Sequence, residues 1–317
     1  MSRPLAVLNL PLPPFIAELF QPHCEFRPWQ LLEQGSQADL AAIQALVIYG
    51  HPHVDDAVLD RVPNVKVISN FGVGVDHIDV KAAARRGIPV GNTPGAVDNA
   101  TADMTMTLLL SLARNVVSGD RFARSPGWAR FDPSDLPGKE VYGATLGIIG
   151  LGRIGKQVAK RAKGFDMKIL YHRRHRDPEA EQALGVEYAD LDTLLSRADF
   201  VTLNVPLTPD TRGLIGAAQL RKMRKDAMLI NIARGGVLDH AALTQALSER
   251  WIAAAALDVT EPEPLPRDHP LLKLDNLIIT PHLGSATVAT RRRMGQMMVD
   301  NLVAGLAGKP LPYQVKG

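Results

Sequence analysis

The chain has 317 residues, 46% of them hydrophobic and 22% charged, which is typical of a globular protein large enough for two domains. Lysine and arginine number 36 against 33 aspartate and glutamate, so the net charge of +3 is too small to indicate a nucleic-acid partner. The longest apolar run, residues 106–113, is far shorter than the ~20 residues of a membrane span, and the single cysteine, Cys24, excludes an internal disulfide. We therefore expect a cytoplasmic protein that contacts neither nucleic acid nor membrane.

The first part of the chain alternates short apolar runs with amphipathic stretches. Buried strands are predicted at residues 5–10, 46–49, 65–69 and 89–91. Helices are predicted between them, at residues 55–61 and 79–86. This alternation predicts a parallel sheet flanked by helices.

Residues 144–155, Ala-Thr-Leu-Gly-Ile-Ile-Gly-Leu-Gly-Arg-Ile-Gly, are the most informative stretch, because an apolar run leads directly into Gly-x-Gly-x-x-Gly. Gly150 lets the chain turn, Gly152 lets the backbone approach a pyrophosphate, and Gly155 lets the following helix pack closely on the strand. A helix-like segment and a second strand at residues 168–171 follow. The pattern predicts a dinucleotide site at a helix N-terminus, with a structural turn as the alternative.

The end of that second strand indicates which dinucleotide binds. Sites for NAD usually carry an acidic residue there, which binds the ribose 2′-hydroxyl. This chain has Tyr-His-Arg-Arg-His-Arg at residues 171–176, with His172 at the acidic position and Arg173 and Arg174 after it. Guanidinium groups suit a phosphate, so we expect NADPH (NADP⁺) as the cofactor. A solvated basic loop is the alternative.

Strands are predicted next at residues 200–203, 227–231, 253–258 and 277–280, followed by a helix at residues 285–307. This last helix needs a partner for its apolar face, and we expect it to pack on the first domain. The prediction is an α/β protein of two doubly wound parallel-sheet domains, with a Rossmann domain inserted into a flavodoxin-like one. The predicted boundaries are residues 1–98 with 286–317 for the substrate domain and residues 99–285 for the NADP-binding domain.

Four segments, residues 204–212, 231–236, 256–266 and 280–285, fall where strands should end. Together with residues 70–79, Asn-Phe-Gly-Val-Gly-Val-Asp-His-Ile-Asp, and residues 91–95, Gly-Asn-Thr-Pro-Gly, they resemble the D-2-hydroxyacid dehydrogenases. The resemblance extends from about Val65 to about Gly305 and is strongest to the NADPH-dependent glyoxylate/hydroxypyruvate reductases. It implies an enzyme that reduces small 2-oxo acids to D-2-hydroxy acids without a metal. Hydroxyphenylpyruvate and 2-ketogluconate reductases of the same family are the alternatives.

The resemblance also implies catalytic roles for three residues. Arg234 would bind the carboxylate and carbonyl of the substrate, and His282 would donate the proton. Glu263 would hold His282 in one tautomer and keep it protonated, since an opposite charge favours the charged form. Glu261 is a competitor for that role, and the family's spacing selects Glu263. Each residue alone also has an ordinary structural interpretation.

Further ligand contacts follow from the same resemblance. In addition to the residues discussed above, it assigns the cofactor to Arg153, Ile154, Val205, Pro206, Thr101, Ile232, Ala233, Asp258 and Gly284. The loop at residues 71–74 would bind the substrate carboxylate through successive N–H groups, with Val73 and Gly74 as its contacts. Ser285 and Arg291 would line the same substrate site. One departure is Asn204, where many relatives carry histidine.

The resemblance implies a homodimer in which the helix at residues 101–115 and the loop near Trp128 cross between subunits. The apolar run at residues 104–112 suits a buried helix of a monomer equally well. A protein of a different class, an NAD(H)-sensing corepressor of the C-terminal-binding-protein type, would share the fold. Such a protein favours an acidic residue where His172 stands, so Arg173 and Arg174 favour the enzyme.

Overall fold

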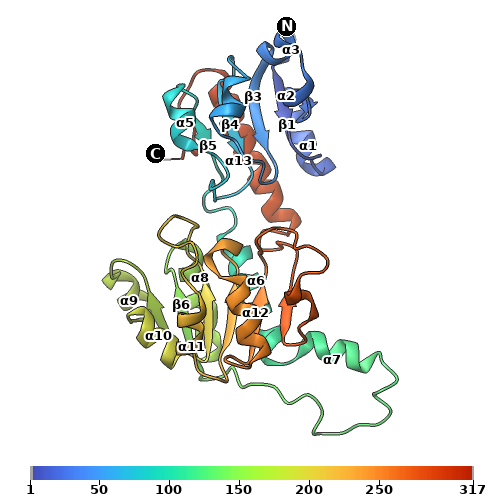
Figure 1. Cartoon of the computed structure of the whole chain (residues 1–317). Coiled ribbons are helices and arrows are strands. Elements are labelled where there is room, and N and C mark those ends of the chain that lie inside the picture. The colour runs from blue at the N-terminus through green and yellow to red at the C-terminus, as the bar shows by residue number, and fades with distance from the viewer. Residues whose placement is uncertain (1–2, 316–317) are drawn as a thin grey trace. The chain divides into compact units, whose positions relative to one another are not determined.

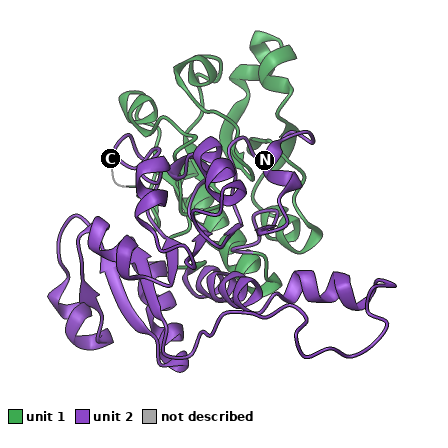
Figure 2. Ribbon diagram, turned by 60° about the horizontal axis from the view of Figure 1, so that its bottom comes forward, with its two compact units in different colours: residues 1–97, 286–317 green, residues 98–285 purple. Residues whose placement is uncertain are grey.

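The computed structural model describes residues 3–315 of the chain, which divides into two compact units. Unit 1 comprises Met1–Val97 and Ala286–Gly317, and unit 2 comprises Asp98–Ser285. Along the sequence, unit 2 is therefore one continuous segment that separates the two segments of unit 1 (Figure 2). Within residues 3–315, no helix is both long enough and apolar enough to cross a membrane.

Unit 1 contains a parallel sheet in the order β2-β1-β3-β4-β5, the flavodoxin-like order predicted for this part of the chain. Its strands are β1 (Leu5–Leu8), β2 (Glu25–Pro28), β3 (Ile43–Ile48), β4 (Val67–Asn70) and β5 (Val90–Gly91). The sequence does not predict β2, because its residues are polar or only partly buried and it ends in proline. These features are tolerated because β2 lies at an edge of the sheet.

Helices cover both faces of this sheet (Figure 1). They are α1 (Pro14–Phe20), α2 (Leu31–Gln34), α3 (Gln37–Ala41), α4 (Asp56–Asp60), α5 (Val80–Arg85) and α13 (Val288–Leu306). The predicted return of the last helix is confirmed, since α13 packs against β4 and α1 through buried Met298 and Leu302. It begins at Val288 because the hydroxyl of Thr287 caps it by accepting from the N–H of Thr290.

Unit 2 contains a parallel sheet in the order β12-β11-β10-β9-β6-β7-β8, which is the Rossmann order with one further strand. Its strands are β6 (Thr145–Ile149), β7 (Lys168–His172), β8 (Glu187–Tyr188), β9 (Phe200–Leu203), β10 (Met228–Asn231), β11 (Ala254–Leu257) and β12 (Leu277–Ile279). The predicted fold class is confirmed in both units. The short edge strand β8 is an element that the sequence pattern does not predict.

Two apolar cores cover the faces of this sheet, because alternate residues of each strand point to opposite sides. Leu146 and Ile148 belong to one core, whereas Ile149 and Val201 belong to the other. The helices are α6 (Asp98–Ala113), α7 (Val116–Ala123), α8 (Arg153–Ala162), α9 (Pro178–Leu184), α10 (Leu191–Arg197), α11 (Ala217–Lys222) and α12 (His240–Ser248). Short 3₁₀ turns lie at Lys163–Phe165, Gly235–Val237 and Pro270–Lys273.

The apolar run of α6 is buried within unit 2. Leu108, Leu109 and Leu112 belong to its core, and α6 packs against α8, β10 and β11. Residues 124–140, here called the arm, contain no helix or strand and extend from α7 away from the sheet (Figure 1). The arm exposes Trp128 and Phe131, whose accessible fractions are 51% and 81%. The arm therefore carries exposed aromatic side chains, whereas the apolar run of α6 is buried.

Candidate functional site

The predicted site residues of unit 2 lie along one edge of its sheet. All seven strands are parallel, so the segments that follow them emerge at the same edge, in the order in which the strands lie side by side. From β12 towards β7 these segments carry, in turn, His282, Glu263, Arg234, Val205 with Pro206, the turn at Gly150, and His172. His282 and Glu263 thus lie at one end of the row and the basic loop at the other.

The glycine turn after β6 has the geometry that a dinucleotide requires. Gly150 has a φ of +101°, and a Cβ at Gly155 would lie 2.3 Å from the carbonyl oxygen of Gly150, so a side chain is excluded at both positions. A Cβ at Gly152, by contrast, would meet no atom within 4 Å. Helix α8 begins directly after Gly152, and no side chain caps its first turn. The middle glycine therefore faces open space beside the N–H groups of Arg153 and Ile154, a site that suits a pyrophosphate.

The basic loop after β7 is partly neutralised by an acid that the sequence analysis missed. Arg173 donates to Asp177 Oδ2 at 2.9 Å, and Lys156 Nζ lies 2.7 Å from the same oxygen. The hydrogen bond from Lys156 is the largest of the effects that lower the pKa of Asp177. Arg174 is 84% exposed, and its guanidinium lies 3.7 Å from Asp210 Oδ2, which is also exposed. Arg174 is therefore more accessible to a ligand than Arg173 is.

His172 itself faces the backbone. Its Nδ1 lies 3.1 Å from the carbonyl oxygen of Ala189, and its ring lies beside that of Tyr188. Asp177 caps α9 by accepting from the N–H of Ala180. The Asp-Pro pair at residues 177–178 is a helix-start signal in the sequence, but nothing in that pattern predicts the pairing with Arg173.

His282 and Glu263 form a close pair, with 2.6 Å between Nδ1 and Oε1. Both side chains are about one-third exposed, at 32% and 34%. The other oxygen of Glu263 accepts from the N–H of Thr260 at 3.2 Å, which fixes the orientation of the carboxylate. A carboxylate at Nδ1 places a proton on that nitrogen, so Nε2 is the atom that can exchange a proton with a ligand.

Asp258 organises the loop that carries His282. Its carboxylate, which is almost fully buried, accepts from the hydroxyl of Thr280 and from the N–H groups of Leu283 and Gly284, at 2.6, 2.7 and 2.8 Å. The hydroxyl of Thr101 donates to the carbonyl oxygen of Gly284 at 3.2 Å. Asp258, Thr101 and Gly284 are thus brought together. A carboxylate has about four acceptor positions, of which these bonds use three.

The two candidate acids have different partners. Arg212 Nη1 lies 2.8 Å from Glu261 Oε2, whereas Glu263 contacts His282. A Cβ at Gly235 would lie 2.1 Å from the backbone of Thr260, so the loop after β10 packs directly on the loop that carries both acids. This contact places the segment of Arg234 beside that of Glu263.

Asn231 holds the segment of Arg234. This buried amide donates to the carbonyl oxygen of Arg234 at 2.9 Å and accepts from the N–H of Ala233 at 3.0 Å. Ile232, which stands between Asn231 and Ala233 in the sequence, is buried. The sequence pattern predicts no role for Asn231 or Arg212, although both lie inside segments that resemble the family.

The remaining predicted residues belong to different units. Val73 and Gly74 lie in the loop after β4 of unit 1, and Val73 is 38% exposed. Arg291 lies in the first turn of α13, also in unit 1, and its charge opposes the effect of burial, which raises the pKa of Tyr49. Ser285 is the last residue of unit 2 and is half-buried.

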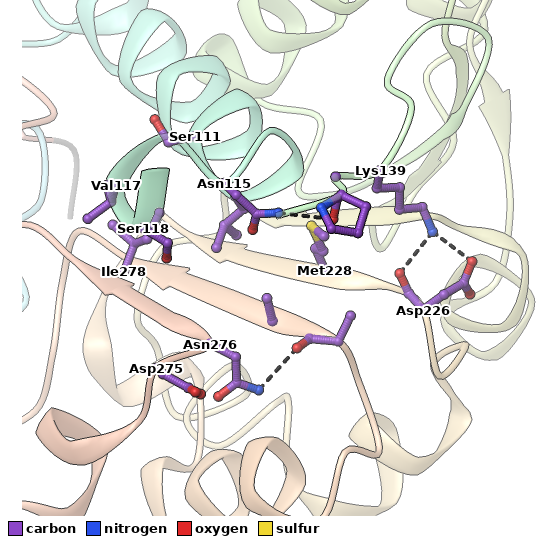
Figure 3. A pocket seen from close by; sticks show the side chains of 15 residues that line it. Ser111, Asn115, Val117, Ser118, Lys139, Asp226, Met228, Asp275, Asn276 and Ile278 are labelled. Carbon is purple, nitrogen blue, oxygen red and sulfur yellow. Dashed lines mark hydrogen bonds and ion pairs between the residues drawn. The ribbon is translucent and has the colours of Figure 1, made fainter. Parts of the chain in front are cut away.

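A cavity of about 410 Å³ lies at the opposite edge of the sheet of unit 2 (Figure 3). Met228, which begins β10, and Ala254, which begins β11, contribute to its lining together with Asn115 and Lys139. None of the predicted site residues lines it. Within residues 3–315, no group of three or more histidine, cysteine or acidic residues is arranged to hold a metal ion.

Comparisons with known proteins agree with this geometry. The family model of the D-isomer specific 2-hydroxyacid dehydrogenase NAD binding domain matches residues 106–284. A glyoxylate reductase from Thermococcus kodakarensis is 42% identical over 99% of this chain and 96% of its own length. Another from Korarchaeum cryptofilum is 48% identical over 83% of this chain and 79% of its own.

Solved structures show the same likeness. The TT0316 protein of Thermus thermophilus has a TM-score of 0.90 and 40% identity, with 98% of this chain and 100% of that chain covered. An NADPH-dependent glyoxylate/hydroxypyruvate reductase from Sinorhizobium meliloti, in complex with NADP and malonate, also has a TM-score of 0.90. It is 32% identical, with 99% of this chain and 97% of that chain covered.

Proposed function

Because the chain belongs to the D-isomer specific 2-hydroxyacid dehydrogenase family, and is therefore an oxidoreductase with an NAD-binding domain, we propose that it reduces glyoxylate and hydroxypyruvate with NADPH. The observation that carries the proposal is the 2.6 Å pair of His282 and Glu263 at the same sheet edge as the glycine turn. A protein that only senses a dinucleotide needs no such acid–base pair.

The reaction converts the carbonyl of a 2-oxo acid into an alcohol by addition of a hydride and a proton. NADPH, when bound, supplies the hydride to the carbonyl carbon. His282 gives the proton on Nε2 to the carbonyl oxygen, and Glu263 stabilises the imidazolium before that transfer. Arg234 binds the substrate carboxylate and polarises the carbonyl, where negative charge develops.

Three observations support NADPH over NADH. No acid stands at His172, Arg174 is exposed at the end of β7, and a relative of similar structure is described as a complex with NADP. Arg173 contributes less, because Asp177 already neutralises it. We therefore assign the 2′-phosphate mainly to Arg174. The pyrophosphate is assigned to the N–H groups that follow Gly152.

Unit 1 contributes the loop at residues 72–74, in which the N–H groups of Val73 and Gly74 bind the substrate carboxylate. Asp258 and Thr101 contribute to cofactor binding chiefly by shaping the loop at Gly284, and the fourth acceptor position of Asp258 would take an N–H of the cofactor carboxamide. Val205, Pro206, Ile232 and Ala233 form the wall along the cofactor.

A substrate panel tests the proposal. NADPH oxidation should be followed with glyoxylate, hydroxypyruvate, hydroxyphenylpyruvate and 2-ketogluconate, each repeated with NADH. Preferred turnover of the two smaller acids with NADPH supports the proposal, and preference for either larger acid supports the alternative reductases of this family. Tight cofactor binding without turnover of any acid would favour the dinucleotide-sensing class.

We also propose that the protein is a homodimer. The support is the arm, whose Trp128 and Phe131 are exposed and belong to none of the apolar cores of the described residues. Exposed aromatic side chains of this size are typical of protein–protein interfaces. The family's dimer makes a second copy of this chain the partner that we assign to the arm.

A further inference from the structure

We propose that Asn70 and His77 are positioning residues for the substrate carboxylate, because they hold residues 72–74, the carboxylate loop, with its N–H groups directed outward. This inference rests on the proposed function, in which that loop binds the carboxylate. The loop follows β4 directly, at the carboxyl edge of the sheet of unit 1. A loop in that position has no helix or strand to fix its peptide groups, so other contacts must do so.

The carbonyl oxygens of the carboxylate loop all accept hydrogen bonds from the protein. Asn70 Nδ2 donates to the oxygens of Gly72 and Gly74 at 3.3 and 3.0 Å, and the N–H of Thr93 donates to that of Gly72 at 3.0 Å. Asn92 Nδ2 donates to the oxygen of Val73 at 2.8 Å. Every acceptor of the loop is thus engaged.

The N–H groups of the loop, in contrast to its carbonyl oxygens, have no hydrogen-bond partner among the described residues. Gly72 has a φ of +143°, a conformation that other residues rarely adopt, so the backbone of the loop depends on this glycine. The loop therefore presents donors without acceptors, which is the polarity that a carboxylate requires.

His77 determines which way the Asn70 amide faces. Both carbonyl contacts of Asn70 need its Nδ2, so its Oδ1 is left to accept, and His77 Nε2 lies 3.0 Å from it. The proton of this contact is therefore on Nε2 of His77. A rotated amide would place Oδ1 against two carbonyl oxygens and Nδ2 against the N–H of His77. Both residues are buried, so water cannot replace the lost contacts cheaply.

Loss of the His77 donor should act on the carboxylate and not on the chemistry. Asn70 would then be free to rotate, so the oxygen of Gly74 would lose its donor and that of Gly72 would keep only the N–H of Thr93. The loop would then expose an acceptor to an anion. A carboxylate binds equally in the ground state and the transition state. The expected signature is therefore a raised KM with a nearly unchanged kcat.

The test compares His77→Phe, which keeps a ring of similar size without the donor, with His77→Gln, which retains an N–H. The control is Asn64→Ala, since Asn64 likewise donates to a carbonyl oxygen, that of Ala41, but at the opposite edge of the same sheet. The measurements are kcat and KM for glyoxylate, the Kd of NADPH by fluorescence, and the Kd of oxalate by calorimetry with NADP⁺ present. Oxalate serves as an unreactive dicarboxylate.

In His77→Phe, the KM for glyoxylate and the Kd of oxalate should both rise about ten-fold or more, as expected for a buried acceptor left unpaired. In His77→Gln the rise should be clearly smaller, while the Kd of NADPH should stay within about two-fold in every variant. Unchanged KM and oxalate affinity in His77→Phe would overturn the inference. An equal loss of kcat, NADPH affinity and glyoxylate affinity would also overturn it, because it would indicate a purely structural role.

If His77→Phe does not fold, Asn70→Asp tests the same contacts, because it replaces the Nδ2 donor to Gly72 and Gly74 by a carboxylate oxygen. It should raise the KM for glyoxylate several-fold, and an unchanged KM would again overturn the inference.

The failure of the proposed function and the failure of the positioning role can be told apart. A wild type that binds oxalate, but reduces no 2-oxo acid, contradicts the proposed function alone. A wild type that reduces glyoxylate, with variants of unchanged KM and oxalate Kd, contradicts the positioning role alone.

Discussion

Arg173 donates a 2.9 Å hydrogen bond to Asp177, a carboxylate that is largely buried and also caps α9. The same carboxylate oxygen contacts Lys156. Two of the cations nearest to the end of β7 therefore already have an anionic partner. Arg173 and Arg174 look equivalent in the sequence, but only Arg173 is held by Asp177. Separate predictions for Arg174 and Asp177 follow.

Arg174→Ala should lose most of the preference for NADPH. The wild type should favour NADPH over NADH by at least about ten-fold in kcat/KM, since a charge-assisted contact contributes roughly 1.5–3 kcal/mol. NADH kinetics should stay nearly unchanged in the variant. Arg197→Ala, which removes another exposed arginine of unit 2 that pairs with Glu187, is the control and should alter neither cofactor. Equal losses with both cofactors would contradict the assignment.

Asp177→Asn should strengthen NADPH binding by several-fold, because it removes an anion beside the proposed phosphate site. Asparagine can still cap α9, so the helix should be retained. Lys156, above all, keeps the pKa of Asp177 below its usual range, so the carboxylate is ionised throughout neutral pH. The gain should therefore be constant between about pH 6 and 9, well above the ordinary Asp pKa of ~3.9. Fluorescence titration measures it, and weaker NADPH binding would show that Asp177 instead orients Arg173 for the phosphate.

Glu263→Gln and Glu261→Gln form a matched pair, since the two acids lie two residues apart with different partners. Without the Glu263 carboxylate, the imidazole of His282 loses the anion that faces its Nδ1, so kcat/KM for glyoxylate should fall by about ten-fold or more, as expected for loss of a charge-assisted hydrogen bond. Glu261→Gln should leave kcat/KM nearly unchanged, because Glu261 pairs with Arg212. Steady-state kinetics of both variants at one pH distinguishes the two acids. A loss in Glu261→Gln only would assign the role to Glu261.

His282→Ala and Arg234→Ala should impair catalysis in different ways. Removal of the proton donor should lower kcat by about 10²–10⁴, the usual range for general acid–base catalysis. Arg234→Ala should also raise the KM for glyoxylate, because Arg234 is proposed to contact the carboxylate in the ground state. Steady-state kinetics with saturating NADPH resolves both effects. Normal glyoxylate reduction by His282→Ala would refute the mechanism.

The sequence predicts backbone features of the site better than side-chain partners. The turn at Gly150 and Gly155 is predictable because close packing excludes any larger residue at these positions, and that requirement is local. The pairs Arg173–Asp177 and Arg212–Glu261 are not predictable in this way, because they depend on which rotamers meet across loops. Asn70 illustrates both cases. Its loop is recognisable from the glycines, whereas its amide contacts become visible only in three dimensions.

The edge strands show a similar limit in the fold. Strand β2 has charged and partly exposed residues, and β8 spans only Glu187–Tyr188. A strand paired on one side needs neither a continuous apolar run nor strict alternation, so period-based interpretation misses β2 and β8, although it detects the apolar edge strands β5 and β12. The central strands, buried on both faces, carry the apolar runs that this interpretation requires, and all of them were predicted.

The arm should hold two copies of the chain together. Light scattering at low micromolar concentration should give a mass of about twice 34.4 kDa for the wild type. Phe131→Asp combined with Trp128→Ser should shift the mass towards the monomer, because both substitutions place polar groups on the exposed apolar surface of the arm. Leu10→Ser, at an exposed apolar residue of unit 1, is the control and should leave the dimer intact. A wild-type mass near 34.4 kDa would rule out the dimer without affecting the proposed chemistry, since His282, Glu263 and Arg234 all belong to a single chain.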